Sequence, residues 1–324
     1  MPDILITEPI AAGAIELLRA AYDVEVAPEL WRDPDVLCRQ IASVRGVIVR
    51  NQTELSSEII AGANKLEVIG RAGVGLDNID VAAASAAGVV VSTTPQENAI
   101  SVAELVLGFM LTLARRVAEA DRHVRQGGWD RHSFVGTELH GKSLGIVGFG
   151  RIGYLTAMRA RAFGMQIIAH DEYLNPNSIL LAEAGAELLP LDRLLMQSDF
   201  VSCHVPLTAE TRGMFDHKRF ALMKQSAFFI NASRGQIVKE SDLVRALEEE
   251  ALAGAALDVR ETEPPKADTL ARFDNVVLTP HIAAFTEEAQ QRVVNAICED
   301  VARVLEGRQA LNAINTPLAQ RGGA

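Results

Sequence analysis

Three charged side chains in the second half of the chain could together hold an anion and move a proton. Arg234, Glu263 and His281 each come shortly after an apolar run that is typical of a buried strand. Ligands of open parallel sheets bind beyond the carboxyl ends of the strands, so the three residues are predicted to converge on one edge. A histidine beside a carboxylate suits proton transfer near neutral pH, and an arginine can hold a carboxylate with two hydrogen bonds.

A glycine-rich loop in the middle of the chain has the form of a dinucleotide-binding turn. Gly148-Phe149-Gly150-Arg151-Ile152-Gly153 follows an apolar strand, 144–147, and opens a predicted helix, 151–163. A second strand, 165–169, then leads to an acidic residue, Asp171. The glycine pattern alone is weak evidence, but this order of strand, loop, helix, strand and acid is what a dinucleotide fingerprint requires.

Each part of this loop has a role that dinucleotide binding requires. Gly148 permits the tight turn, Gly150 lets backbone amides approach a pyrophosphate, and Gly153 allows the helix to pack closely on the strand. The helix N-terminus contributes positive partial charge. Asp171 can accept hydrogen bonds from both ribose hydroxyls and repels a 2′-phosphate, and its neighbours include no arginine. The cofactor is therefore predicted to be NAD rather than NADP.

The three charged residues also have simpler interpretations when taken one at a time. Arg234 could cap a helix, Glu263 could be a solvated loop acid, and His281 could pack within its own loop. Beside a nicotinamide site, their joint occurrence favours the catalytic interpretation.

Length and composition favour two domains and a small-molecule partner. The chain has 324 residues, and single hydrophobic cores stop growing at roughly 250–300 residues. Its formal net charge is −11 and it contains no block of Lys and Arg, which argues against nucleic acid or an anionic membrane as the main partner. The apolar stretch 102–114 is too short to span a bilayer and contains Glu104, so it is expected to be a buried helix.

The cysteines and the start of the chain predict a cytoplasmic protein. Cys38, Cys203 and Cys298 are odd in number, far apart and without metal-ligand spacing. We interpret them as buried, reduced thiols and expect no metal site. A predicted strand at residues 3–7 leaves no room for a cleavable signal peptide.

Apolar runs that alternate with helical patterns predict two doubly wound parallel sheets. Strands of the first sheet are expected at residues 4–6, 24–26, 46–49, 66–69 and 89–91. Strands of the second are expected at residues 144–147, 165–169, 200–203, 227–230, 255–257 and 276–278. The division falls near residue 98, and a last helix, 286–306, could return the chain to the first domain. We therefore expect a discontinuous substrate domain, 1–97 and 286–324, around a continuous NAD-binding domain, 98–285.

The segment 117–140 is expected to be a dimerisation arm. Its polar part, 121–139, contains Trp129 and Phe134 and belongs to neither predicted sheet. Such an excursion is more easily explained by packing on another subunit than as a free loop. We expect a homodimer, with a tetramer as the alternative.

Motifs along nearly the whole chain match a known family. In chain order they are 70–80 (GRAGVGLDNID), Thr94-Pro95 with Asn98, 101–104 (SVAE), 134–139 (FVGTEL), Gly141-Lys142, the glycine loop, 206–208 (PLT), 231–235 (NASRG), Glu263-Pro264 and 280–284 (PHIAA). The chain resembles the D-isomer-specific 2-hydroxyacid dehydrogenases, and most of all the phosphoglycerate dehydrogenase-like branch in its short form, without a regulatory C-terminal domain. The resemblance implies an α/β fold with a Rossmann-type cofactor domain and a flavodoxin-like substrate domain.

The resemblance also implies which residues form the site. Arg234, Glu263 and His281 would be the family's catalytic arginine, glutamate and histidine, and the helix 98–115 would cover the pyrophosphate. The implied cofactor contacts are Gly148, Gly150, Arg151, Ile152, Gly153, Asp171, His204, Pro206, Thr211, Ala232, Ser233, Asp258, His281 and Ala283. The implied substrate contacts are Arg50, Asn51, Arg71, Gly73, Val74, Gly75 and Asn98.

The predicted reaction is hydride transfer between NAD and C2 of a small 2-hydroxy or 2-keto acid. Arg50 and Arg71 each end a predicted strand of the substrate domain. Two extra cations suit a dianion, unless either one pairs with an acid of its own domain. By resemblance the substrate is D-3-phosphoglycerate or 3-phosphohydroxypyruvate, with sulfolactate and hydroxypyruvate or glyoxylate as alternatives.

Two departures from the family and one other class of protein bear on this interpretation. The chain ends at Ala324, so feedback through a C-terminal regulatory module is not expected. Arg260 stands where an aromatic or other apolar residue is common after Asp-Val. NAD-sensing corepressors of this fold can retain all three catalytic residues, but no disordered, partner-binding extension flanks the two domains here. The formate dehydrogenase-like branch is expected to have Gln-Pro at the position where this chain has Glu263-Pro264. This difference argues against a formate dehydrogenase.

Overall fold

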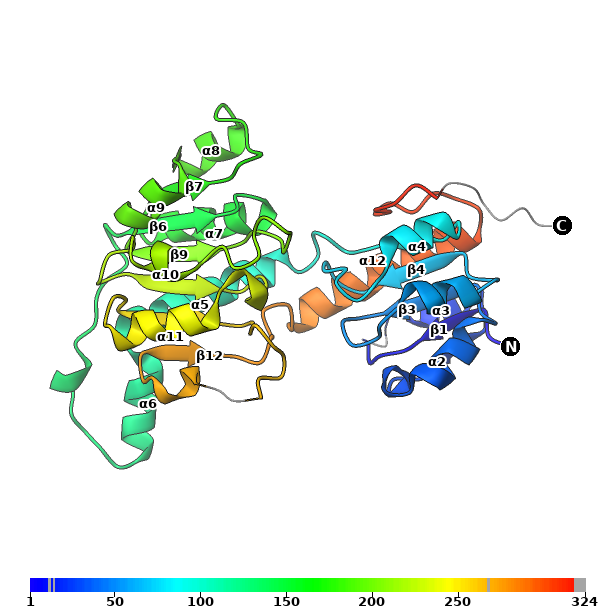
Figure 1. The fold of residues 1–324 in the computed structure, drawn as a ribbon, viewed down its shortest axis with the longest axis horizontal. Coiled ribbons are helices and arrows are strands. Elements are labelled where there is room, and N and C mark those ends of the chain that lie inside the picture. The colour runs from blue at the N-terminus through cyan, green and yellow to red at the C-terminus, as the bar shows by residue number, and fades with distance from the viewer. Residues whose placement is uncertain (11–12, 14, 267–268, 318–324) are drawn as a thin grey trace. The chain divides into compact units, whose positions relative to one another are not determined.

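The structure is a computed structural model that describes residues 1–10, 13, 15–266 and 269–317. Within these residues the chain separates into two compact units (Figure 1). Met1–Asn98 and the chain from Phe285 onward form the discontinuous unit, and Ala99–Ala284 forms the continuous unit. Residues 318–324, which the sequence analysis assigns to the substrate domain, lie outside the described residues.

The discontinuous unit contains a five-stranded parallel sheet in the order β2-β1-β3-β4-β5. This is the flavodoxin-like order. Its strands are β1 (Ile4–Ile6), β2 (Val24–Val26), β3 (Gly46–Val49), β4 (Val68–Arg71) and β5 (Val90–Ser92). The central strands β1 and β3 are buried along their whole length, as a parallel sheet covered on both faces requires.

Helices cover both faces of this sheet. One face packs on α1 (Ile15–Arg19) and α12 (Glu287–Leu305), and the other on α2 (Pro34–Ile41), α3 (Ser57–Gly62) and α4 (Val81–Ala86). Gly70 of β4 allows the close approach of α12, because a Cβ there would lie 2.8 Å from Val301 and 2.9 Å from Ile297. The final helix thus packs against one face of the first sheet, through contacts between residues that are far apart in the sequence.

The continuous unit contains a seven-stranded parallel sheet in the order β12-β11-β10-β9-β6-β7-β8. The six strands from β8 to β11 follow the Rossmann order, and β12 extends that sheet at one edge. The strands are β6 (Ser143–Val147), β7 (Gln166–His170), β8 (Ala186–Leu188), β9 (Phe200–Cys203), β10 (Phe228–Asn231), β11 (Gly254–Leu257) and β12 (Val276–Leu278). The sequence analysis missed β8, a three-residue edge strand whose central Glu187 is exposed.

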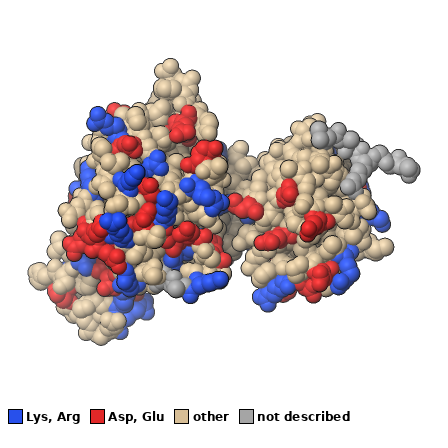
Figure 2. Space-filling view, in the orientation of Figure 1, with Lys and Arg blue, Asp and Glu red and all other residues tan. Residues whose placement is uncertain are grey.

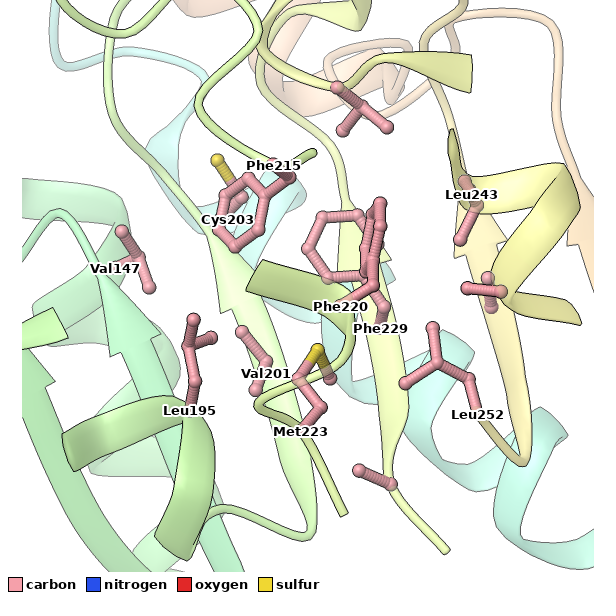
Figure 3. Packing of buried hydrophobic residues seen from close by; sticks show 14 of the residues in the cluster. Val147, Leu195, Val201, Cys203, Phe215, Phe220, Met223, Phe229, Leu243 and Leu252 are labelled. Atoms are coloured by element: carbon pink, nitrogen blue, oxygen red, sulfur yellow. The ribbon is translucent and has the colours of Figure 1, made fainter. Parts of the chain in front are cut away.

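Two hydrophobic clusters flank this second sheet. One face packs on α5 (Ala99–Arg115), α7 (Arg151–Ala162) and α8 (Ile179–Ala184). The other packs on α9 (Leu191–Gln197), α10 (His217–Phe220) and α11 (Glu240–Glu248), and its centre is the aromatic group Phe215, Phe220 and Phe229 (Figure 3). The helices and strands of this unit therefore hold the loops at the sheet edges in fixed places.

The surface of the protein carries charged side chains of both signs. Acidic and basic side chains are interspersed on the face shown in Figure 2. No helix among the described residues is long and apolar enough to cross a membrane.

The prediction that all three cysteines are buried is wrong for Cys38, which is exposed, whereas Cys203 and Cys298 are buried. Leu37 and Ile41 occupy the buried face of α2, which leaves Cys38 on the face toward solvent.

Candidate active site

The glycine loop links β6 to the start of α7, and each of its glycines has its own environment. Gly148 has a φ of 92°, and a Cβ there would lie 2.8 Å from the backbone of His204 and Val205. A Cβ at Gly153 would overlap the carbonyl oxygen of Gly148. Gly150 caps the helix, and a Cβ on it would meet nothing within 4 Å. Packing thus requires two of the glycines, and the third leaves open space at a helix N-terminus, where a pyrophosphate can approach.

Asp171 ties the end of β7 to this loop. One carboxylate oxygen accepts a hydrogen bond from the Phe149 amide at 2.9 Å, and the other accepts one from the Tyr173 amide at 3.0 Å. Strand β7 pairs in parallel with β6, so the acid and the glycine loop leave the sheet at the same edge. The carboxylate is held at the end of β7, and its remaining lone pairs can accept further hydrogen bonds from hydroxyl groups.

His204, directly after β9, has one ring nitrogen without a hydrogen-bond partner among the described residues. Its Nε2 lies 2.9 Å from the Ser202 hydroxyl, while its buried Nδ1 has no hydrogen-bond partner. Burial lowers the pKa of His204 to about 4, so the ring is neutral at physiological pH. Buried polar atoms are normally satisfied, so the unpartnered nitrogen fits a polar group of a bound dinucleotide at this edge.

The other predicted cofactor residues lie in the same unit, and several of them also hold their own loops. Thr211 donates its hydroxyl proton to the Pro206 carbonyl at 2.6 Å. Ser233 donates from its amide and its hydroxyl to Asn231. Arg151 and Ile152 are the first residues of α7, Ala232 follows β10, and Ala283 follows β12.

Glu263 and His281 form a direct pair. The Glu263 Oε2 atom lies 2.7 Å from the His281 Nδ1 atom, and Glu263 Oε1 accepts a hydrogen bond from the Arg260 amide at 2.9 Å. The Arg234 guanidinium donates to the Ser233 carbonyl at 2.8 Å, and its charge acts on Glu263. The structure therefore brings together the three residues that the sequence analysis singled out.

The surroundings of Glu263 lower its pKa below the ordinary value. Burial by itself would raise the pKa, but the hydrogen bonds from His281 and the Arg260 amide, with the charges of His281 and Arg234, outweigh it. A carboxyl whose pKa is depressed on folding contributes stability that is present above its unfolded pKa and is lost as pH falls through the folded one. Glu263 is therefore a carboxylate at neutral pH.

A buried acid, Asp258, holds the turn that carries His281. Its carboxylate accepts hydrogen bonds from the Thr279 hydroxyl at 2.5 Å and from the Ile282 and Ala283 amides at 2.8 Å each. His281 itself has a φ of 57°, an uncommon conformation for a residue other than glycine. The sequence analysis gave Asp258 a cofactor role only; its role in stabilising this turn becomes visible in the structure.

The predicted substrate residues of the discontinuous unit, apart from Asn98, lie at the ends of β3 and β4 or in the loops that follow them. Arg50 and Asn51 come directly after β3, and Arg71 is the last residue of β4. Arg71 lies over Gly73, where a Cβ would overlap its guanidinium. Val74 and Gly75 continue the loop, and the buried side-chain oxygen of Asn98 has no hydrogen-bond partner.

The Arg50 side chain has no ion pair among the described residues. Its guanidinium donates to the Pro9 carbonyl at 3.3 Å and lies 4.8 Å from the centre of the Phe285 ring. Burial lowers the pKa of Arg50, and the charge of Glu8 opposes that effect. A partly desolvated cation of this kind favours an anionic ligand.

Glu8 organises the loop that carries Arg50, and the sequence analysis missed it. This residue is only 2% exposed, and its carboxylate accepts the amides of Arg50, Gln52 and Thr53 at 2.8, 3.1 and 2.9 Å. The available signal was an acid soon after an apolar strand, which is weak because loop acids are common.

Replacing Glu8 with Gln is expected to lower the free energy of unfolding by about 1–3 kcal/mol, because the new NH₂ group faces backbone donors. Urea denaturation followed by circular dichroism would measure the change. Glu54→Gln, at an exposed position of the same loop region, is the control and should differ little from wild type. Equal stability of the Glu8→Gln variant would show that the three amide contacts do not support the loop.

Comparison with known proteins defines the family. Residues 107–283 match the model of the D-isomer specific 2-hydroxyacid dehydrogenase, NAD binding domain. The D-3-phosphoglycerate dehydrogenase of Methanocaldococcus jannaschii is 44% identical over 98% of this chain and 60% of its own length. The corresponding protein of Archaeoglobus fulgidus is 42% identical over 97% of this chain and 59% of its own length. This chain belongs to the D-isomer specific 2-hydroxyacid dehydrogenase family.

Solved structures of relatives agree with this assignment. The TT0316 protein of Thermus thermophilus superposes with a TM-score of 0.90 at 34% identity, over 96% of this chain and 99% of its own. A D-lactate dehydrogenase of Aquifex aeolicus, complexed with NAD and lactic acid, gives a TM-score of 0.86 at 28% identity, over 97% of this chain and 99% of its own. The predicted family, the fold class and the NAD cofactor are thereby confirmed. The chain spans about 60% of the length of the two curated dehydrogenases.

Proposed function

We propose that this 2-hydroxyacid dehydrogenase family member transfers a hydride between NAD and C2 of D-3-phosphoglycerate or 3-phosphohydroxypyruvate. The observation that carries the proposal is the 2.7 Å contact between Glu263 and His281. It belongs to the unit that holds the NAD fingerprint and lies within the electrostatic reach of Arg234. The names of the two archaeal relatives support the choice of substrate.

The residues of the chain divide the chemistry between them. The glycine loop and Asp171 would hold NAD, which when bound would accept or supply the hydride. The Nδ1 atom of His281 faces Glu263, so Nε2 is the atom that takes the substrate hydroxyl proton in oxidation and returns it in reduction. Ionised Glu263 stabilises the imidazolium that forms, and Arg234 holds the substrate carboxylate and polarises the oxygen on C2.

Replacing His281 with Ala is expected to lower kcat by about 10²–10⁴-fold and to leave NADH binding nearly unchanged, because only proton transfer is lost. Steady-state kinetics with 3-phosphohydroxypyruvate and a fluorescence titration with NADH would measure the two effects. The depressed pKa of Glu263 predicts that its protonation limits the wild-type rate only at pH values below the ordinary pKa range of a glutamate.

The histidine experiment has a control and a clear contrary outcome. His217→Ala, on α10 and outside the predicted site, should turn over as wild type does. A parallel loss of NADH affinity in His281→Ala would contradict the proton-transfer role. Cofactor binding by a wild type that reduces no keto acid would favour a sensor of NAD over an enzyme.

The distal anion of the substrate is proposed to bind Arg50 and Arg71. Each arginine sits at the carboxyl end of a strand, and a phosphate would supply the negative charge that both can meet. Sulfolactate would satisfy the same guanidinium groups, and hydroxypyruvate or glyoxylate would engage them less fully. Charge recognition at these two residues therefore separates the candidate substrates.

Removing either arginine is expected to cost about 1.5–3 kcal/mol with a dianionic keto acid, the range for a hydrogen bond to a charged group. Hydroxypyruvate, which lacks the second anion, should be reduced about as well as by wild type. The measurement is the ratio of kcat/KM for 3-phosphohydroxypyruvate or sulfopyruvate to that for hydroxypyruvate in Arg50→Ala and Arg71→Ala. Arg39→Ala, an exposed arginine on α2, is the control. Equal losses on every substrate would remove the two arginines from the distal site.

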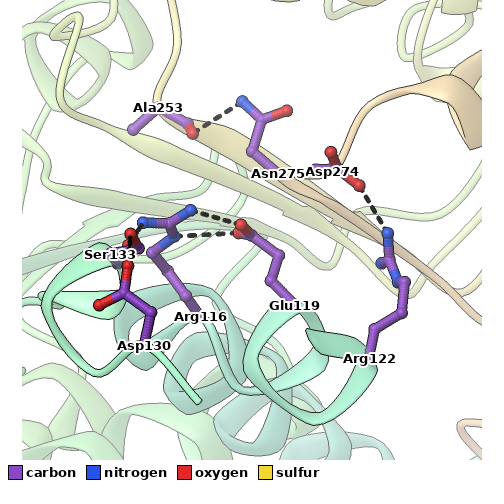
Figure 4. Close-up of polar contacts among 8 residues, drawn as sticks. All are labelled: Arg116, Glu119, Arg122, Asp130, Ser133, Ala253, Asp274 and Asn275. Carbon is purple, nitrogen blue, oxygen red and sulfur yellow. Dashed lines mark hydrogen bonds and ion pairs between the residues drawn. The ribbon is translucent and has the colours of Figure 1, made fainter. Parts of the chain in front are cut away.

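The arm 117–140 is proposed to form a homodimer. Helix α6 (Val117–Arg125) has no buried residue, and Trp129 and Val135 are 90% and 78% exposed. Polar contacts such as the Arg122–Asp274 ion pair attach the arm to the rest of the continuous unit (Figure 4). Beside the arm lies a cavity of about 350 Å³, lined by residues of the arm and of the amino edge of the sheet. Exposed apolar side chains next to a cavity fit a second copy of the chain.

Trp129→Ala is expected to weaken self-association, because a large exposed ring contributes much of the energy at an interface. Sedimentation equilibrium would measure the dimer dissociation constant. Tyr173→Ala is the control, since Tyr173 is 93% exposed in the same unit but lies outside the arm. Unchanged association of Trp129→Ala, or a monomeric wild type, would contradict the arm as the interface.

A cytoplasmic location is also part of the proposal. The three cysteines are free thiols in the structure. Free thiols are typical of reducing compartments, where disulfides are rare.

A further inference from the structure

Arg260, the residue that departs from the family pattern, is buried in the loop that carries Glu263. It is 6% exposed, and its guanidinium forms a two-pronged contact with Glu240. Nε donates to Glu240 Oε1 at 3.0 Å, and Nη2 donates to Oε2 at 2.9 Å. Glu240 is the first residue of α11, so the contact anchors the loop to a helix. This parallel arrangement is the geometrically most specific form of an arginine–carboxylate pair.

The same carboxylate also holds the next residue of the loop. The Glu261 amide donates to Glu240 Oε1 at 2.5 Å, and the Glu240 amide donates to the Glu261 carboxylate at 3.3 Å. On the other side the peptide between Arg260 and Glu261 abuts Gly235, where a Cβ would overlap the Arg260 carbonyl. The start of the loop is therefore confined between Gly235, the residue after Arg234, and Glu240 at the start of α11.

The backbone of Arg260 continues this series of contacts into the proposed proton-transfer pair. Its amide donates to Glu263 Oε1 at 2.9 Å, and Glu263 Oε2 meets His281 Nδ1 at 2.7 Å. That amide belongs to the Val259–Arg260 peptide, which joins the Arg260–Glu261 peptide at the Arg260 Cα atom. A group that fixes the Arg260 side chain and the following peptide therefore also restricts the direction of the Arg260 amide and, through it, the Glu263 carboxylate.

We propose that Arg260 and Glu240 are positioning residues, which hold the Arg260 amide so that Glu263 orients His281 for proton transfer. The inference rests on the proposed function of His281 and goes beyond it, since neither Arg260 nor Glu240 touches the reacting atoms. A buried ion pair alone is weak evidence for a stability role, because desolvation offsets much of its attraction. Arg260 itself gives this pair a specific connection to the site, because its side chain contacts Glu240 and its amide contacts Glu263.

The charged groups around the proton-transfer pair come from several segments. Arg234 follows β10, Glu240 starts α11, and Arg260 and Glu261 begin the loop. Substitutions at Glu240 or Arg260 change charge as well as geometry, so the test must separate the two effects. Arg260→Lys keeps the charge and loses the two-pronged contact, and therefore provides that separation.

The test is a double-mutant cycle in which Arg260→Met, Arg260→Lys and Glu240→Gln are made in wild type and in Glu263→Gln. In wild type, Arg260→Met and Glu240→Gln are expected to lower kcat about 10- to 100-fold by misplacing the pair, with NADH binding unchanged. Arg260→Lys should recover only part of the rate. In the Glu263→Gln background the same substitutions should change kcat by less than about twofold, because Arg260 acts through Glu263.

Two controls separate positioning from general stability. Arg245→Met and Glu249→Gln break an exposed ion pair on the same helix, 2.7 Å long, and should leave kcat as in wild type. Thermal unfolding of each variant shows whether it folds. A lower melting temperature with an unchanged kcat would mean that the buried pair only stabilises the fold, and would overturn the proposal. Losses of kcat that multiply fully in the Glu263→Gln background would overturn it as well.

A spectroscopic readout distinguishes failure of this inference from failure of the proposed function. The His281 Nδ1 proton, held by Glu263, should give a downfield imidazole resonance that disappears in His281→Ala. Arg260→Met should broaden or shift this resonance whether or not the protein turns over a keto acid. An intact resonance in Arg260→Met would sink the positioning role even in an active enzyme. A wild type without turnover whose resonance responds to Arg260→Met would instead refute the proposed function, and with it the catalytic purpose of the contact.

Discussion

All strands of the continuous unit run parallel, so every loop that follows a strand leaves from the same edge of the sheet. This constraint brings the glycine loop after β6, Asp171 after β7 and His281 after β12 to one side, although more than a hundred residues of chain separate the first from the last. A parallel sheet can form only with long connections, and those connections become the helices that cover its two faces. The edge where a ligand can bind is thus a consequence of the sheet itself.

Buried carboxylates fix the conformation of loop segments in both units. Glu8, Asp258 and Asp300 each accept two or more backbone amides, and each anchors a segment that follows or crosses the end of a strand. A loop whose amides are removed from water needs acceptors, and a carboxylate supplies several at once. Glu8 supports the loop of Arg50 in this way, and Asp258 supports the turn of His281. The shape of the functional loops therefore depends on residues that do not resemble catalytic ones.

The fold leaves the identity of the substrate open, since the same architecture occurs in a glyoxylate reductase of Paecilomyes thermophila and a D-lactate dehydrogenase of Aquifex aeolicus. Those structures have TM-scores of 0.88 and 0.86 with this chain. What distinguishes substrates within one fold is the charge and shape of a few loop residues. Arg50 and Arg71 are the residues proposed for this role, because a guanidinium distinguishes a dianion from a monoanion by charge.

The sequence by itself determined the parallel sheets, the dinucleotide loop and the residues Arg234, Glu263 and His281, because apolar runs, glycine spacing and residue type are local properties of the chain. It did not reveal β8, whose three residues carry too little hydrophobic pattern, or the exposure of Cys38, which depends on the orientation of α2. The contacts of Glu8 and Glu240 were decided only by tertiary structure. Each carboxylate bonds to groups 20 or more residues away, and hydrogen bonds of that range are set by how the loops meet after folding.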